Sequence, residues 1–335
     1  MQGRCEMRDV KTHNIDEFKR AQTSFYPLGG GEGEHPTITV FTPTYNRAHL
    51  LPRLYESLSK QTFKDFEWII VDDGSTDNTE EVVQSWLHPA SPPQSPLRVG
   101  SAEFWKFPIY YIRKVNGGKH RAINRGVQEA RGELFFIVDS DDSLPEDAIE
   151  NIVFYWQQIK DDMSFGGVAG YMAHHDGTII GKGNDDEILD CTSLELRYKH
   201  YVTGDMAEVF RTDVLKEFPF LEIENERFCP EALVWNRIAQ KYKLRVFKKV
   251  IYFRDYLDGG LTSKIVRIRM NSPIATVTHY QELNSYDIPF KEKVKAAINY
   301  WRFRACVPKG KAAPRLPWYW FWCKPLGYLM HLRDK

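Results

Sequence analysis

The sequence lacks the features that mark membrane-spanning, secreted or nucleic-acid-binding proteins. No run of 18 apolar residues occurs, so no segment is predicted to cross a membrane. The N-terminus, MQGRCEMRDVKTHNIDEF, has no apolar core of the kind found in a secretory signal. The 45 Lys and Arg residues equal the 45 Asp and Glu residues, whereas wholesale nucleic-acid binding usually shows a basic excess.

Cysteine spacing and glycine motifs exclude several further classes of site. The five cysteines are scattered and odd in number, without a CxxC pair, so neither a disulfide framework nor a structural zinc is indicated. A reducing, cytoplasmic setting is expected. No GxGxxG and no GxxxxGK[ST] occurs, so neither the usual dinucleotide-binding motif nor the P-loop is used to bind phosphates.

What is present is a globular α/β pattern in the first half of the 335 residues. Short apolar runs, each followed by a polar loop and a helix-spaced apolar segment, occur four times. Short connections between such units favour right-handed βαβ units and a largely parallel sheet. The predicted strands cover residues 37–41, 67–71, 109–113 and 134–138.

The last of these strands ends in an unusual acidic group. The run LFFIV is followed at once by Asp139, Ser140, Asp141 and Asp142. Carboxylates packed at the end of a buried strand repel one another unless a positive group lies among them, and a divalent cation with oxygen ligands meets that need. An acidic helix N-cap is the alternative, since Pro145 follows.

The loops after the four strands should open at one edge of the sheet, where open α/β sheets bind ligands. Asp73 in the second loop could accept a hydrogen bond from a base edge or a ribose hydroxyl. Lys119, beside Gly117 and Gly118, could reach a phosphate. A nucleotide diphosphate is therefore a sensible ligand. The alternatives are a turn role for Asp73, simple packing for Tyr45 and a surface charge for Lys119.

The rest of the chain is less regular and suggests three regions. Residues 1–36 end in a glycine-rich stretch and are predicted to be a flexible lead-in, 37–264 the α/β domain, and 265–335 a helical, aromatic-rich extension. Residues 88–107, rich in proline, are interpreted as a surface insertion. In the second half, strands are expected near 168–173 and 244–253, and helices over 207–218 and 231–242.

The C-terminal tail contains PWYWFW (317–322) with Lys324, Arg333 and Lys335 after it. Trp and Tyr beside basic residues suit a membrane interface, so a peripheral membrane contact is one reading. Ordinary packing of the tail on the domain is the other, because aromatic clusters also form cores.

Four stretches of the sequence together resemble the family 2 glycosyltransferases of the GT-A fold. They are TVFTPTYNR (39–47), WIIVDDGSTDNT (68–79), NGGKHRAINRGVQEARGE (116–133) and FFIVDSDD (135–142). Each is weak alone, but the four occur in order over about a hundred residues, with the acidic strand end last. The resemblance implies a Rossmann-like, mostly parallel sheet flanked by helices.

The same resemblance implies roles for individual residues. Thr42, Pro43, Tyr45 and Asp73 would hold the nucleoside, with Asp73 reading a uracil edge. The DxD element maps onto Asp139, Ser140 and Asp141. Asp139 would face the ribose and the metal, and Asp141 would coordinate Mn²⁺ or Mg²⁺ with the diphosphate. Asp142 stays open between a ligand and a helix cap.

A general base for the acceptor hydroxyl is also implied by the resemblance. The closest match is FCPEALVW (228–235), where Glu231 is the expected base and Ala232 stands in place of the usual second acid. Glu226 is the reserve candidate. Asp205 is expected near the acceptor or the donor sugar, and residues 256–262 form a glycine-hinged loop that could cover the donor.

The resemblance implies an inverting, metal-dependent transfer of a hexosyl or N-acetylhexosaminyl group. The donor would be a UDP-sugar and the acceptor a hydroxyl of a glycan or a lipid-linked saccharide, in cell-surface polysaccharide synthesis. The setting would be cytoplasmic, with a peripheral position at the inner face of the plasma membrane as an open alternative. Two alternatives stay open: a sugar-nucleotide nucleotidyltransferase, although TPTYNR lacks its glycine-rich loop, and a non-catalytic nucleotide-sugar or glycan-binding protein.

Overall fold

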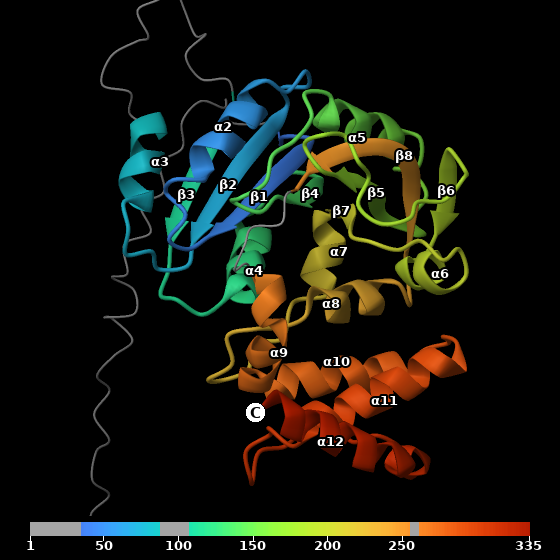
Figure 1. Cartoon of the computed structure of the whole chain (residues 1–335). Coiled ribbons are helices and arrows are strands. Elements are labelled where there is room, and N and C mark those ends of the chain that lie inside the picture. Colours follow the sequence, from blue (N-terminus) through green and yellow to red (C-terminus); the bar gives the residue numbers. More distant parts are fainter. Residues whose placement is uncertain (1–34, 88–106, 255–260) are drawn as a thin grey trace, which may run out of the picture.

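The described part of the chain is organised around one sheet of eight strands, in the order β3-β2-β1-β4-β7-β5-β8-β6 (Figure 1). The computed structural model describes residues 35–87, 107–254 and 261–335. The predicted lead-in and the proline-rich insertion therefore lie almost wholly outside the described residues. The sheet and its flanking helices confirm the predicted α/β class of fold.

The first half of the sheet consists of four parallel strands. β1 (Ile38–Thr44) lies between β2 (Phe66–Asp72) and β4 (Leu134–Ile137), and β3 (Ile109–Arg113) pairs with the outer side of β2. Every residue of β1 and β2 is buried, as expected for strands covered on both faces. The helices that follow these strands are α2 (Leu51–Ser59), α3 (Thr79–Leu87), α4 (Lys119–Glu129) and α5 (Ala148–Gln157).

The second half of the sheet mixes the two strand directions. β7 (Met206–Arg211) runs antiparallel between β4 and β5 (Phe165–Ala173). β8 (Lys243–Phe253) is parallel to β5, and β6 (Ile188–Cys191) closes the edge antiparallel to β8. The intervening helices are α6 (Ser193–Tyr198), α7 (Thr212–Glu217) and α8 (Glu231–Ile238).

The helix predicted over residues 207–218 is wrong in its first half. Residues up to Arg211 belong to β7, and only α7 is helical. β7 exchanges ladder hydrogen bonds with strands on both of its sides. These long-range bonds outweigh the local helical spacing of the apolar residues, because propensity is a weak determinant beside tertiary context.

Two apolar cores cover the two faces of the sheet. One holds Trp68 and Trp156 together with the buried sides of α2, α3 and α5. The other holds Phe41, Phe135 and Phe210 together with α4, α7 and α8. Successive residues of a strand point to opposite faces, which is why neighbours in one strand enter different cores. The result is a helix–sheet–helix arrangement, visible in Figure 1.

The C-terminal region is a stack of helices below α8 (Figure 1). α10 contacts α8, α11 packs on α10, and α12 packs on α11. A small core around Val277, Tyr280 and Phe303 joins α10 to α11. Among the described residues, no helix is long and apolar enough to span a bilayer. The elements are α9 (Leu261–Asn271), α10 (Pro273–Ser285), α11 (Phe290–Arg304), the 3₁₀ helix η1 (Trp318–Cys323) and α12 (Lys324–Asp334).

Candidate active site

The candidate site lies where β1, β2, β3 and β4 end. The parallel registers bring the last residues of these strands to one edge of the sheet, so the four polar loops open together. From the opposite side of the loops, the segment before α8 approaches closely. A Cβ at Gly118 would lie 2.0 Å from the carbonyl oxygen of Arg227, and Gly118 has φ +99°. Only glycine fits both requirements.

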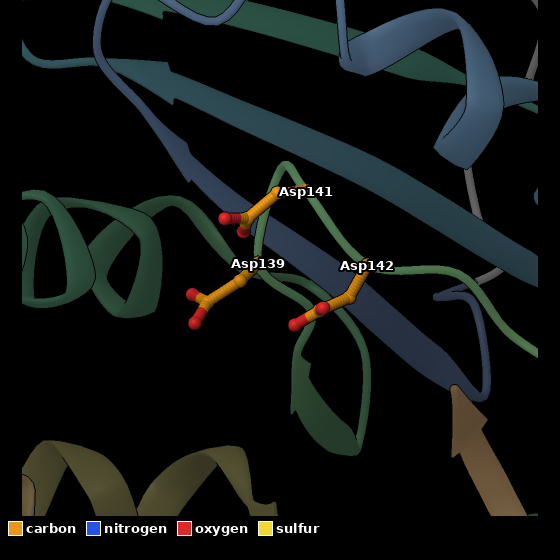
Figure 2. Close-up of side chains that lie close together, drawn as sticks. All are labelled: Asp139, Asp141 and Asp142. Carbon is orange, nitrogen blue, oxygen red and sulfur yellow. The ribbon is translucent and has the colours of Figure 1, made fainter. Parts of the chain in front are cut away.

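Three carboxylates gather in the turn after β4 (Figure 2). Asp139, Asp141 and Asp142 each place one oxygen within 4.8 Å of the others. Ser140 lies buried in the same turn. Carboxylate oxygens at this spacing are the donor set that Mg²⁺ and Mn²⁺ prefer, so the residues fit a divalent cation. Arg53 helps to hold this turn by donating a hydrogen bond to the carbonyl oxygen of Asp141.

Tyr252, at the end of β8, fixes this turn. Its hydroxyl donates to Asp142 Oδ2 at 2.6 Å and accepts from the amide of Asp139 at 2.9 Å. Backbone hydrogen bonds between Ser143 and Phe253 clamp the same two segments. Nothing in the sequence around Tyr252 marks it as part of the site, because β8 reaches the turn only through the sheet.

Asp142 is not a helix cap, so one of its two expected roles is excluded. α5 begins at Ala148 and its N-cap is Asp147. Asp142 is buried instead, facing Tyr252. Burial, followed by the charges of Asp139 and Asp141, raises the pKa of Asp142 to about 7.

This raised pKa makes the stability of the metal-free protein depend on pH. Because the folded state binds the Asp142 proton more tightly than the unfolded state, the stabilisation is present below the ordinary pKa and is lost as pH rises through about 7. The free energy of unfolding should fall by about 2 kcal/mol between pH 5 and pH 7 from this group. Urea unfolding in EDTA should show this slope in the wild type and lose it in Asp142→Asn. Equal slopes in both proteins would contradict the assignment.

Lys119, the first residue of α4, joins the acidic turn to α8. Its ammonium lies 2.7 Å from Asp139 Oδ1 and 2.8 Å from Glu231 Oε1. Burial opposes the charge, but the two carboxylates outweigh it and raise the pKa of Lys119. Glu231 opens α8 directly after Pro230. The structure thus brings together three residues expected at the site from distant parts of the sequence.

Glu226, the reserve base, is bound to the C-terminal helices. It is buried, and its carboxylate accepts hydrogen bonds from the amides of Ile274 and Ala275 at 2.6 and 2.9 Å. These amides belong to the first turn of α10, where a negative group is favoured by the helix dipole. Glu226 therefore fixes the segment that leads to Glu231 onto the C-terminal helices.

The expected nucleoside residues lie along β1 and the loop after β2. β1 extends through Thr44, so Thr42 and Pro43 belong to a strand and not to the predicted loop, because β1 pairs with β2 as far as Asp72. The Thr42 hydroxyl accepts from Trp68 Nε1 inside the core. Tyr45 is 47% exposed at the strand end. The hydroxyl of Thr44 is buried without a hydrogen-bond partner and was not among the expected residues.

Asp73 organises the loop after β3. Its carboxylate accepts from the amides of Gly117 and Gly118 at 2.9 and 2.7 Å and contacts the Lys114 ammonium at 2.5 Å. Glycine allows both amides to approach one carboxylate. The predicted contact between Asp73 and a uracil edge stays a prediction.

Asp205 lies just before β7 and forms an ion pair with Arg254 at 2.6 Å. Burial, then the charges of Asp205, Asp142 and Asp139, shift the pKa of Arg254, and the carboxylates outweigh burial to raise it. Arg254 thus interacts electrostatically with both Asp205 and the acidic turn, although no pattern in the sequence singles it out. The predicted glycine-hinged loop lies outside the described residues except at its end, where α9 begins.

An open α/β sheet with an acidic turn, a lysine and a glutamate at its strand-end loops is the arrangement expected of a GT-A-type transferase. The family model described as Glycosyl transferase family 2 matches residues 39–180. Over these residues the chain is similar to the family 2 glycosyltransferases. This match covers all four sequence stretches and confirms the family resemblance that they carry.

Individual relatives agree with this family. The glycosyltransferase GlyG of Streptococcus pneumoniae is 34% identical over 40% of this chain and 40% of its own length. A Campylobacter jejuni protein named GalNAc(5)-diNAcBac-PP-undecaprenol beta-1,3-glucosyltransferase is 26% identical over 68% of this chain and 67% of its own length. The chain therefore spans less than half of the first of these relatives.

Solved structures share the fold. TarS 1–349 of S. aureus in complex with UDP-GlcNAc aligns with a TM-score of 0.55 and 18% identity, over 81% of this chain and 82% of that chain. Mannosyltransferase PcManGT of Pyrobaculum calidifontis, in complex with GDP-Man and Mn²⁺, aligns with a TM-score of 0.51 and 17% identity, over 96% and 93%. At these identities the likeness establishes the GT-A fold.

Proposed function

We propose that the chain transfers a sugar from a UDP-sugar to a hydroxyl group of a glycan or a lipid-linked saccharide, with inversion at the anomeric carbon. The observation that carries this proposal is the bridge made by Lys119. One ammonium contacts both Asp139 in the acidic turn and Glu231 at the start of α8. The acidic turn expected to bind the donor and the glutamate expected to act on the acceptor therefore both lie within hydrogen-bonding distance of the Lys119 ammonium.

Glu231 is proposed as the general base. Its side chain is 40% exposed, so an acceptor hydroxyl can approach it, while Pro230 and α8 fix its backbone. A carboxylate in this position takes the proton of the hydroxyl as that oxygen attacks the anomeric carbon and the diphosphate leaves. A single displacement of this kind converts an α-linked donor into a β-linked product.

Asp139 and Asp141 are proposed to hold Mn²⁺ or Mg²⁺, with Asp142 completing the set of oxygen ligands. A divalent cation bound there would neutralise charge on the leaving diphosphate. Lys119 would donate to the same diphosphate. An ammonium has three protons, and Lys119 already contacts two oxygens of Asp139 and one of Glu231. Donor binding therefore has to replace one of these contacts.

The proposed nucleoside site consists of Thr42, Pro43, Tyr45 and Asp73, with Ser140 and Asp205 nearer to the sugar. The UDP-GlcNAc complex of a protein with the same fold supports a uridine nucleotide, and the Mn²⁺ complex of another supports the cation. The undecaprenol-linked acceptor in the name of the Campylobacter relative supports a lipid-linked acceptor. We propose a cytoplasmic setting at the inner face of the plasma membrane, in cell-surface polysaccharide synthesis.

The proposal is tested by thermal shift and by UDP release. A panel of UDP-, GDP- and CDP-sugars is screened with Mn²⁺, with Mg²⁺ and with EDTA, and UDP-sugars should raise the melting temperature only with a divalent cation. UDP release should then require both that donor and an acceptor. Release of pyrophosphate from a nucleoside triphosphate and a sugar phosphate would point to a nucleotidyltransferase. Donor binding without turnover on any acceptor would point to a binding protein.

A further inference from the structure

The C-terminal end of the chain presents a large exposed apolar surface. We define the η1–α12 face as the exposed aromatic and leucine side chains of these two helices. Trp318 is 86% exposed and Trp322 is 60% exposed, and Leu329 on α12 is 64% exposed. Large apolar side chains exposed together on two consecutive helices indicate an interaction site.

The η1–α12 face is held rigidly by the protein. Trp320 and Cys323 are buried in a small core against α11, and Trp301 Nε1 donates to the carbonyl oxygen of Trp320 at 3.2 Å. Gly327 lies against α11 so closely that a Cβ there would be 2.5 Å from the carbonyl oxygen of Ile298. The exposed rings and leucines therefore surround anchors that fix their orientation.

α12 turns small and polar residues toward the protein and leucines toward the solvent, which is the reverse of an ordinary surface helix. Its protein-facing side carries Gly327, His331 and Asp334, and Asp334 pairs with Arg302. Leu329 and Leu332, one turn apart, are 64% and 51% exposed. A surface helix normally turns its apolar side inward and its polar side outward. Here the leucines face outward, and their exposure to water costs free energy unless an apolar environment covers them.

Basic residues accompany the apolar surface. Residues 308–335 contain six Lys and Arg residues but one acidic residue, Asp334, in a chain whose net charge is zero. That aspartate is already paired with Arg302, and of the six basic residues Lys311 lies 3.5 Å from Glu224, which still leaves a basic excess in this region. Lys324 lies over the ring of Phe321, with its ammonium 4.8 Å from the ring centre. The face therefore combines aromatic rings, leucines and unbalanced positive charge.

We propose that the η1–α12 face docks on an anionic phospholipid bilayer. Trp and Tyr prefer the interface between headgroups and acyl chains, and the leucines of α12 would enter the acyl boundary. The surrounding Lys and Arg residues match the negative surface of such a bilayer. A second copy of the chain is a poorer partner, because two such faces would bring like charges together without acids to pair them. This inference extends the proposed function and does not depend on the identity of the donor or the base.

α12 is the outermost labelled helix of the C-terminal stack and lies farthest from the sheet among the labelled elements (Figure 1). The helix lies on the membrane and does not cross it, in agreement with its length of 11 residues.

The proposal is tested by flotation of the full chain with vesicles. Binding to vesicles of phosphatidylcholine with about one third phosphatidylglycerol is expected, with weaker binding to pure phosphatidylcholine and at high salt. The double variant Leu329→Gln with Leu332→Gln should bind at least about tenfold more weakly. The control is Phe154→Gln with Ile188→Gln, two apolar residues that are 60% and 42% exposed elsewhere on the protein. It should bind as the wild type does.

Three results would overturn the proposal. They are no flotation of the wild type at low salt, equal flotation of the leucine variant, and a dimer in solution that the leucine variant abolishes. Cation-dependent UDP binding, measured on the same samples, reports on the active site separately. Its loss would count against the proposed function and not against the membrane surface.

Discussion

Glu231→Gln is expected to lower kcat by roughly 10²–10⁴-fold while cation-dependent binding of UDP remains. Glutamine keeps the size of the side chain but cannot take a proton from an acceptor hydroxyl. The backbone position is set by Pro230 and by the contact between Arg227 and Gly118, and these are unchanged. Initial rates with saturating donor, together with calorimetric binding of UDP, measure both quantities.

The matched control is Glu224→Gln. Glu224 lies in the same segment, its side chain is 80% exposed, and its pairing with Lys311 is long at 3.5 Å. This variant should keep its activity within about twofold, as is usual for a surface position. A Glu231→Gln enzyme with unimpaired turnover would disprove the assignment of Glu231 as the base, but it would not contradict the proposed donor site.

Asp141→Asn should reduce cation-dependent binding of UDP and kcat/KM by about 100-fold or more, since a cation in such a site supplies several kcal/mol to the leaving group. The fold should survive, because Arg53 holds the carbonyl oxygen of Asp141 and not its carboxylate. Calorimetry of UDP with and without Mn²⁺ separates the metal-dependent part of binding.

Asp147→Asn is the control for that experiment. Asp147 is exposed six residues further along, at the N-cap of α5, and its side chain makes no capping hydrogen bond. It should leave both quantities unchanged. If Asp141→Asn retains the full effect of Mn²⁺ on UDP binding, the acidic turn is not the cation site.

The parts of the fold that sequence reasoning anticipated are those dictated by local patterns. β1 to β4 each combine an apolar run with turn-forming residues, so their positions along the chain and their parallel direction could be predicted from short segments. Burial on both faces also made the acidic end of β4 conspicuous, because carboxylates rarely follow such a run without a partner. Lys119 could also be singled out from local sequence, because it follows a pair of glycines and opens a helix.

The parts that escaped prediction depend on long-range pairing. β7 was mistaken for a helix because its strand character comes from β4 and β5 and not from its own spacing. Tyr252, near the end of β8, and Arg254, directly after β8, interact with the acidic turn although they lie more than a hundred residues further along the chain. The bridge from Lys119 to Glu231 likewise joins helices that no local pattern relates.

The attachment of Glu226 to α10 bears on how freely this chain can be divided. Its carboxylate lies in the α/β half, and the amides that it accepts from lie beyond residue 264. Arg237 on α8 also pairs across this point with Glu282, at 2.6 Å. Removing the C-terminal helices would leave a buried carboxylate and a guanidinium without partners, next to the segment that carries Glu231. The extension is therefore not an exchangeable module, and chimeras joined at this point would have to retain α10.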